Sequence, residues 1–177
     1  KEYFIEIFLD QNSEVSNFIL NNINIKNAVI VDPKSKLELI TSIKKIEYGL
    51  FMDSGPLHVA KMFNKKGILL ETTVSTKILL KNYNLIKGIE NEYSSSYCSA
   101  PCGLTDIFNY KNKFGCYDSL KIDNIESKNQ NFKHMINRGV KNNYLETFKK
   151  SVGCISSLNV QNIYNTIKKD LSICEES

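Results

Sequence analysis

The sequence has 177 residues, which is enough for one domain with a buried core. Apolar residues make up 42% of it and charged residues 24%, as in an ordinary globular protein, and no apolar run approaches the roughly 20 residues that a membrane-spanning helix requires. The net charge of +4 comes from scattered lysines, not from a basic stripe with interleaved aromatic residues, so it argues against nucleic-acid binding. A mild positive excess still suits contact with anionic lipid or with a phosphorylated substrate.

The beginning of the sequence indicates a piece of a longer protein. The chain begins at Lys1 in the middle of what reads as a strand, without an initiator Met, and no charged-then-apolar leader opens it. We therefore expect no secretory signal and a cytoplasmic location. Reduced thiols are then the default state of the five cysteines.

Residues 1–90 alternate short β-rich runs with helical patterns. The predicted strands are 3–9, 28–31, 49–52 and 67–70, and a fifth lies near 85–86. The first two predicted helices are capped by Ser13 and Ser35, and Pro56 lies in the first turn of the third. The apolar residues expected to face inward are Val15, Phe18, Ile19 and Leu20 in the first helix, and Leu37, Leu39, Ile40 and Ile43 in the second.

This alternation predicts an α/β fold, because strand–helix–strand repeats need crossover connections, which are right-handed and place parallel strands in one sheet. We predict a Rossmann-like three-layer domain with a parallel sheet, spanning 1–177 as a single domain. Residues 1–90 form its βα core, 91–130 an irregular loop that contains cysteines, and 131–177 a helical C-terminal tail. The tail's helical segments are marked by Tyr144, Leu145 and Phe148, and, after the cap Asn159, by Val160, Ile163, Tyr164, Ile167 and Leu171.

The strongest candidate site follows the third predicted strand, where Asp53-Ser54-Gly55 gives way to a helix. Ligands of open α/β sheets bind outside the carboxyl ends of the strands, and the N–H groups of a helix start attract phosphate. Gly55 lets a ligand approach closely, Ser54 adds a hydroxyl donor, and Asp53 can accept hydrogen bonds from sugar or ribose hydroxyls. His58 lies about one turn into the helix and faces back toward the same edge. The alternative interpretation is that Asp53 or Ser54 only caps the helix and that His58 is a core histidine.

The segment Asp53-Ser54-Gly55-Pro56-x-His58-x-Ala60 resembles the signature of glycosyltransferase family nine, the lipopolysaccharide heptosyltransferases and their relatives. Three weaker likenesses follow the family's order and, with this segment, span most of the chain. They are Lys34-Ser35-x-Leu37-Glu38-Leu39 before the motif strand, Cys98-Ser99-Ala100-Pro101-Cys102 after it, and Cys154-Ile155-Ser156-Ser157-Leu158-Asn159-Val160-x-x-Ile163 near the end.

The resemblance implies a GT-B architecture, of which this chain matches the C-terminal, donor-binding half. Members generally invert the anomeric centre without a metal, so no metal or other cofactor is expected. The implied donor is a nucleotide-diphosphate sugar, with ADP-heptose the leading candidate, and the acceptor is a glycan or glycolipid such as lipopolysaccharide, which implies peripheral contact with the inner membrane. The N-terminal acceptor domain would lie upstream of Lys1, so the chain alone would bind a donor weakly and transfer nothing.

Carried over residue by residue, the resemblance makes Asp53 the catalytic residue that contacts the donor sugar's hydroxyls. Ser54, Gly55 and His58 would line the phosphate and sugar end of the donor. The other implied donor contacts are Lys34 and Ser35 near the base, Glu14 near the ribose, and Thr72 or Thr73 at the phosphate.

The chain departs from the family at two places. The family usually has Phe-Gly-Pro-Thr after the fourth strand, where this chain has Leu70-Glu71-Thr72-Thr73, and the stretch between Cys116 and Cys154 is longer than in the family. Without the Gly-Pro turn, the path of the loop after the fourth strand is open. These departures keep a second function open, namely a non-catalytic module of the same fold that senses a nucleotide sugar or docks a partner.

The cysteines support a third hypothesis, a zinc-stabilised interaction domain. Cys98, Cys102, Cys116 and Cys154 could supply four thiolates to zinc, but no short Cys-x2-Cys pair is present and no histidine lies close in sequence, so unbound thiols are favoured. Aromatic residues in the irregular region would staple the loop onto the core, which is the favoured interpretation, or form a surface for sugars or a partner domain. They are Tyr93, Tyr97, Phe108, Tyr110 and Tyr117.

Overall fold

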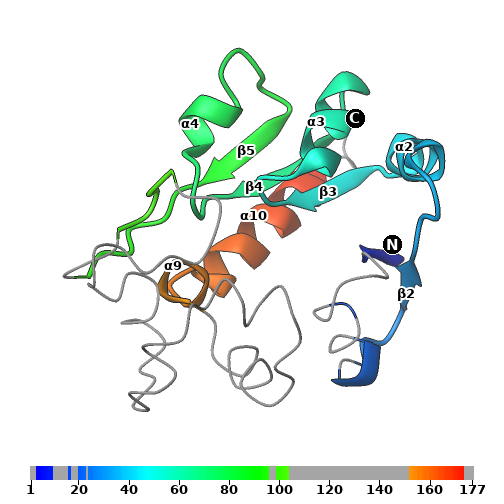
Figure 1. The fold of residues 1–177 in the computed structure, drawn as a ribbon, viewed down its shortest axis with the longest axis horizontal. Coiled ribbons are helices and arrows are strands. Elements are labelled where there is room, and N and C mark those ends of the chain that lie inside the picture. The colour runs from blue at the N-terminus through cyan, green and yellow to red at the C-terminus, as the bar shows by residue number, and fades with distance from the viewer. Residues whose placement is uncertain are drawn as a thin grey trace, which may run out of the picture. The chain divides into compact units, whose positions relative to one another are not determined.

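The computed structural model describes residues 3–9, 16, 20–22, 24–95, 99–103 and 152–173. The chain divides into two compact units, Lys1–Lys45 and Ile46–Ser177, each with its own parallel sheet (Figure 1). The α/β class and the parallel pairing of strands are therefore confirmed. The described strands form one sheet of two strands and one sheet of three, where the sequence predicts a single sheet.

The first unit is built on two short strands. β1 (Ile5–Phe8) pairs in parallel with β2 (Ala28–Val31), with Ile5 opposite Ala28 and Phe8 opposite Val31. Both strands lie within the predicted ranges. Of the helix predicted after Ser13, residues 16 and 20–22 are described and are helical, whereas Ser13 lies outside the described residues.

Helix α2 (Lys36–Lys45) follows β2 and begins at the predicted cap. The Ser35 hydroxyl accepts a hydrogen bond of 3.2 Å from the Glu38 N–H, which satisfies one donor of the first turn. The prediction that its apolar residues face inward holds at the end of the helix, where Ile43 is 1% exposed. It is wrong at the start, where Leu37 is 72% exposed, because only the last turns of the apolar face are covered.

The second unit carries the three-stranded sheet. β3 (Tyr48–Phe51), β4 (Lys66–Leu70) and β5 (Ile86–Ile89) are parallel and lie in the order of the chain. Two crossover segments connect them, one containing helix α3 (Gly55–Met62) and the other the short helix α4 (Thr76–Leu79), which the sequence analysis did not predict. The strands end at a common carboxyl edge, which is where the β3–α3 and β4–α4 connections begin.

Helices cover both faces of this sheet, so the second unit has the three predicted layers (Figure 1). On one face, the Tyr48 hydroxyl donates a hydrogen bond of 2.9 Å to Asp170 of helix α10 (Val160–Ile173). On the other face, a Cβ at Gly88 of β5 would collide with Thr76 of α4. The described part of the predicted helical tail is thus a layer of the domain.

Helix α10 begins as predicted, since the Asn159 side chain accepts a hydrogen bond of 2.9 Å from the Asn162 N–H. The short helix α9 (Gly153–Ser156) precedes it. The other predicted helical segment, around Tyr144, lies outside the described residues. None of the described helices is long and apolar enough to span a membrane.

The core of the second unit lies between the sheet and the crossover helices. Leu57 and Ala60 of α3 are both 0% exposed, as are Ile68 and Leu69 of β4. The Phe51 ring lies over the neighbouring strand positions, where a Cβ at Gly49 or at Gly67 would collide with it. Glycine on adjacent strands therefore makes room for one aromatic ring.

Tyr93 is the one residue of the predicted aromatic group that lies within the described residues. A Cβ at Gly153 of α9 would collide with its ring, so the ring lies directly against that helix. The Tyr93 carbonyl also accepts a hydrogen bond of 2.8 Å from the Ala100 N–H. This is the stapling arrangement that the sequence favours for Tyr93.

Candidate functional site

The connection from β3 to α3 contains the residues of the strongest motif. Ser54, the residue before the helix, has an extended backbone, with φ −163° and ψ 165°, and its side chain makes no capping hydrogen bond. The hydroxyl instead donates to the Met52 carbonyl at 3.1 Å. Pro56 lies in the first turn, as predicted. The interpretation of Ser54 as a side-chain cap is therefore wrong. The backbone N–H groups of Gly55 and Leu57, in the first turn of the helix, donate no hydrogen bond to the Ser54 side chain.

Exposure at this connection also contradicts the alternative interpretation of the histidine. His58 is exposed on α3, so it is not a core residue. Asp53 is exposed as well, and it has no hydrogen-bond or ion-pair partner among the described residues. A Cβ at Gly55 would meet no atom within 4 Å. The start of α3 thus presents an acidic side chain, an imidazole and open backbone to the surface.

The loop after β4 brings the predicted threonines to the same edge of the sheet. Phe51 of β3 pairs with Leu69 of β4. Asp53 lies two residues after Phe51, and Glu71 lies two residues after Leu69. Thr72, the next residue, is 6% exposed, and its hydroxyl has no hydrogen-bond partner within the part of the chain that the structure describes. Thr73 is half-buried, and its carbonyl accepts a hydrogen bond of 2.6 Å from the Gly103 N–H.

The remaining predicted donor contacts belong to the other unit or lie outside the described residues. Lys34 pairs with Asp32, at 2.5 Å between Nζ and Oδ2, and its backbone N–H donates to the Glu38 carboxylate at 2.7 Å. Ser35 caps α2. Glu14 lies outside the described residues. Asp53, Ser54, Gly55, Thr72 and Thr73 therefore lie in the connections that begin at the carboxyl edge of the three-stranded sheet, and His58 lies one turn into α3.

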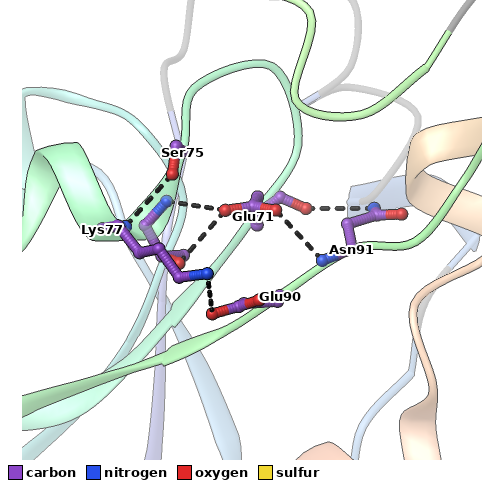
Figure 2. A network of polar contacts seen from close by, with 6 residues as sticks. Glu71, Ser75, Lys77, Glu90 and Asn91 are labelled. Carbon is purple, nitrogen blue, oxygen red and sulfur yellow. Dashed lines mark hydrogen bonds and ion pairs between the residues drawn. The ribbon is translucent and has the colours of Figure 1, made fainter.

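Two buried polar residues at this edge were not predicted as part of the site. Glu71 is 4% exposed and Asn91 is 6% exposed, and they are linked by hydrogen bonds (Figure 2). They follow β4 and β5 just as Asp53 follows β3. The rule that pointed to Asp53, a polar side chain directly after a buried strand, would have found Glu71, which directly follows the predicted strand 67–70. It would not have found Asn91, which lies five residues after the predicted strand near 85–86.

A shallow groove lies beside these residues, between α4 and β5. An ion pair of 3.0 Å joins Lys77 and Glu90 across it (Figure 2). The groove is lined by Thr76, Lys77, Leu80, Ile86, Gly88 and Glu90. These residues include none of the predicted donor contacts, so the groove is not the predicted site.

Two of the four cysteines in the zinc hypothesis lie within the described residues. Cys102 is half-buried and Cys154 is buried. Cys98 and Cys116 lie outside the described residues. The described residues contain no cluster of three or more histidine, cysteine, aspartate or glutamate side chains that could hold a metal ion. Zinc binding by all four cysteines stays a prediction.

Comparison with known proteins identifies no relative of this chain. No protein-family model, no curated protein and no solved structure matches it.

Proposed function

We propose that this chain is the donor-binding part of an inverting, metal-independent glycosyltransferase, which transfers a sugar from a nucleotide-diphosphate donor to a glycan of the cell envelope. The observation that carries the proposal is the β3–α3 connection, where Asp53, Ser54 and Gly55 lie exposed between the end of a parallel strand and the start of a helix. Such connections bind phosphate and sugar groups in open α/β sheets.

The start of α3 suits the diphosphate of the donor. Its first N–H groups have no side-chain cap, and the partial positive charge of a helix N-terminus attracts anions. Gly55 leaves open space for a phosphate to approach the backbone. The Thr72 hydroxyl, which has no partner among the described residues, supplies a further donor at the same sheet edge.

Asp53 suits the sugar of the donor. Its carboxylate is exposed and has no cationic partner within the described residues, so it can accept hydrogen bonds from sugar hydroxyls. His58, one turn into α3, offers a second polar group toward the same ligand. These contacts would orient the anomeric carbon toward the acceptor.

The transfer itself then needs no metal. An acceptor hydroxyl attacks the anomeric carbon as the bond from that carbon to the diphosphate oxygen breaks, which inverts the configuration. Negative charge grows on the leaving diphosphate, and donors fixed at the helix start stabilise that charge. The general base that takes the hydroxyl proton would come from the N-terminal acceptor domain, so the donor-binding part alone would transfer nothing.

The proposed partners are those that the resemblance to the heptosyltransferases implies. The donor would be ADP-heptose, and the acceptor a glycolipid such as lipopolysaccharide, reached from the cytoplasmic side through peripheral contact with the inner membrane. The net charge of +4 suits both an anionic donor and an anionic lipid surface.

A second candidate function is a non-catalytic module of the same fold that senses a nucleotide sugar or docks a partner. The observation that favours it is the buried Glu71, which stands where the family has a Gly-Pro turn. A carboxylate at the phosphate edge adds unfavourable charge for an anionic donor. Turnover by a longer protein that includes the upstream region would exclude this candidate.

The test is a calorimetric titration of the chain with ADP, UDP, GDP and their sugars. We expect one nucleotide diphosphate to bind, and its sugar to bind more weakly to Asp53→Ala by about tenfold or more, because a hydrogen bond to a charged group contributes about 1.5–3 kcal/mol. Glu47→Ala is the matched control, since Glu47 is also exposed and directly precedes β3 at its opposite end. Equal affinity of Asp53→Ala and the unchanged chain would remove Asp53 from the site.

A further inference from the structure

The Glu71 side chain closes the loop that follows β4. Its Oε2 atom accepts hydrogen bonds from the Thr76 backbone N–H at 2.8 Å and from the Thr76 hydroxyl at 3.1 Å. Its Oε1 atom accepts a hydrogen bond of 3.2 Å from the Asn91 backbone N–H. Figure 2 shows the carboxylate between these two segments. The first residue of the loop thus holds the first residue of α4 and the second residue after β5.

The Asn91 side chain extends this network to α9. Its Nδ2 atom donates to the Glu71 carbonyl at 3.1 Å and also to the Cys154 carbonyl. Its Oδ1 atom accepts hydrogen bonds of 2.9 Å from the Ser157 hydroxyl and from the Tyr93 N–H. Because both polar atoms of a 6%-exposed amide are satisfied, the end of β5 is fixed to β4 and to α9.

The loop held in this way carries two of the proposed donor contacts. Thr72 and Thr73 lie between Glu71 and Thr76. The Glu71 carboxylate connects the two ends of this loop through its bonds to Thr76, so it determines where the hydroxyls and backbone N–H groups of Thr72 and Thr73 lie. The carboxylate itself is 4% exposed and accepts three hydrogen bonds from the protein. It is therefore placed to act through the loop and not on a ligand.

We propose that Glu71 is a positioning residue for the diphosphate of the donor: it fixes the loop of Thr72 and Thr73 at the carboxyl edge of the sheet and so sets the affinity for a nucleoside diphosphate. The inference rests on the proposed function. It assigns to a buried carboxylate, whose oxygens accept hydrogen bonds from three protein donors, the geometric role that a rigid turn would have.

A glutamine cannot replace this carboxylate. Both oxygens of Glu71 accept hydrogen bonds from backbone N–H groups, one from Thr76 and the other from Asn91. The side-chain amide of Glu71→Gln has one acceptor oxygen, so in either orientation its NH2 group faces a backbone N–H. One buried N–H then loses its acceptor, although the volume of the side chain is unchanged.

The experiment compares Glu71→Gln with Glu90→Gln in the full chain. Glu90 undergoes the same chemical change at the neighbouring strand end, but its side chain is 57% exposed and, among the described residues, pairs with Lys77 alone. Two quantities are measured for each variant: amide hydrogen exchange at Thr76 and Asn91 without ligand, and the calorimetric affinity for ADP, UDP and GDP. We expect faster exchange and at least tenfold weaker binding for Glu71→Gln, with neither change for Glu90→Gln.

A milder variant keeps the test informative if Glu71→Gln does not fold. Thr76→Val removes the 3.1 Å hydroxyl bond and retains the backbone bond, so a smaller, several-fold loss of affinity is expected. Faster exchange with unchanged affinity, in either variant, would overturn the positioning role. That outcome would refute the role of Glu71 alone, provided that the unchanged chain binds a nucleoside diphosphate and that Asp53→Ala weakens binding of the corresponding sugar. If the unchanged chain binds none of the three, the proposed function fails and the inference fails with it.

Discussion

The Tyr48 hydroxyl donates a hydrogen bond of 2.9 Å to the Asp170 carboxylate, across 122 positions of the chain. Lys87 donates to the other oxygen of the same carboxylate. The bond joins the first residue of β3 to α10, and Lys87 joins β5 to the same point. One half-buried aspartate therefore holds the C-terminal helix against two strands of the sheet.

This arrangement predicts a loss of stability at alkaline pH. Partial burial, and then the hydrogen bond and charge of Asp170, raise the pKa of Tyr48 well above its ordinary value near 10. Because the pKa is higher in the folded state than in the unfolded state, the stabilisation is complete below pH 10 and falls as the pH rises above it. The free energy of unfolding, measured with urea, should show a steeper decline above pH 10 for the unchanged chain than for Tyr48→Phe.

The control for this measurement is Tyr164→Phe, which removes the hydroxyl of a 56%-exposed tyrosine on the same helix, α10. That variant should follow the unchanged chain at every pH. The titration of lysines between pH 8 and pH 11 is common to all three proteins and cancels in the comparison. A constant difference in the free energy of unfolding between Tyr48→Phe and the unchanged chain over this range would therefore contradict the raised pKa of Tyr48.

Substitution of Gly67 tests the packing of the Phe51 ring. A Cβ at Gly67 would meet both the ring and the Gly49 carbonyl, so Gly67→Ala should destabilise the chain by about 1–3 kcal/mol through overpacking. Gly55→Ala, where the Cβ meets no atom, should be neutral or stabilise α3 by up to about 1 kcal/mol. Urea unfolding of both variants gives the comparison, and equal free energies of unfolding would refute the steric explanation.

The core side of α3 offers a second pair of matched substitutions. Leu57 is 0% exposed and Met62, on the same helix, is 78% exposed. Leu57→Ala should lower the free energy of unfolding by about 2–5 kcal/mol, because it removes transfer free energy and leaves a cavity. Met62→Ala should change it by less than about 0.5 kcal/mol. Thermal unfolding followed by circular dichroism measures both variants. A large effect of Met62→Ala would contradict the prediction and would show that this face of α3 is covered in solution.

The cap of α2 predicts a smaller effect in the first unit. Ser35→Ala removes the acceptor of the Glu38 N–H and should destabilise the unit by about 1 kcal/mol. Ser35→Asp retains an acceptor and should preserve stability. Urea titration followed by helical circular dichroism measures both. A Ser35→Ala variant as stable as the unchanged chain would mean that the helix start is satisfied by water alone.

The strands and the crossover rhythm could be read from the sequence because they depend on local signals. The run Ala28–Val31 is apolar and mostly β-branched, and Pro56 directly after a glycine at a strand end favours a helix start. The exposure of Leu37 could not be read in this way, since helical spacing identifies an apolar face but not how far a neighbouring element covers it.

Part of the candidate site was also predictable and part was not. The Asp53–Gly55 segment combines chain-local signals, namely a strand end, a glycine and a helix start. The roles of Glu71 and Asn91 depend on partners 5 and 20 residues away from Glu71, and, for Asn91, on Cys154, 63 residues away. Nothing in the local sequence around Glu71 distinguishes a carboxylate that accepts buried hydrogen bonds from one that faces solvent.

The hydrogen bonds from Asn91 to Cys154 and Ser157 have a consequence for how this chain can vary in evolution. They join the two flanks of the intervening sequence at one side chain, so the distance between those flanks is set by the amide and not by the number of residues between them. Lengthening a closed segment adds only slowly to its entropic cost, about 0.6 kcal/mol for each doubling. Insertions between the flanks are therefore cheap for the fold, whereas replacing Asn91 is not.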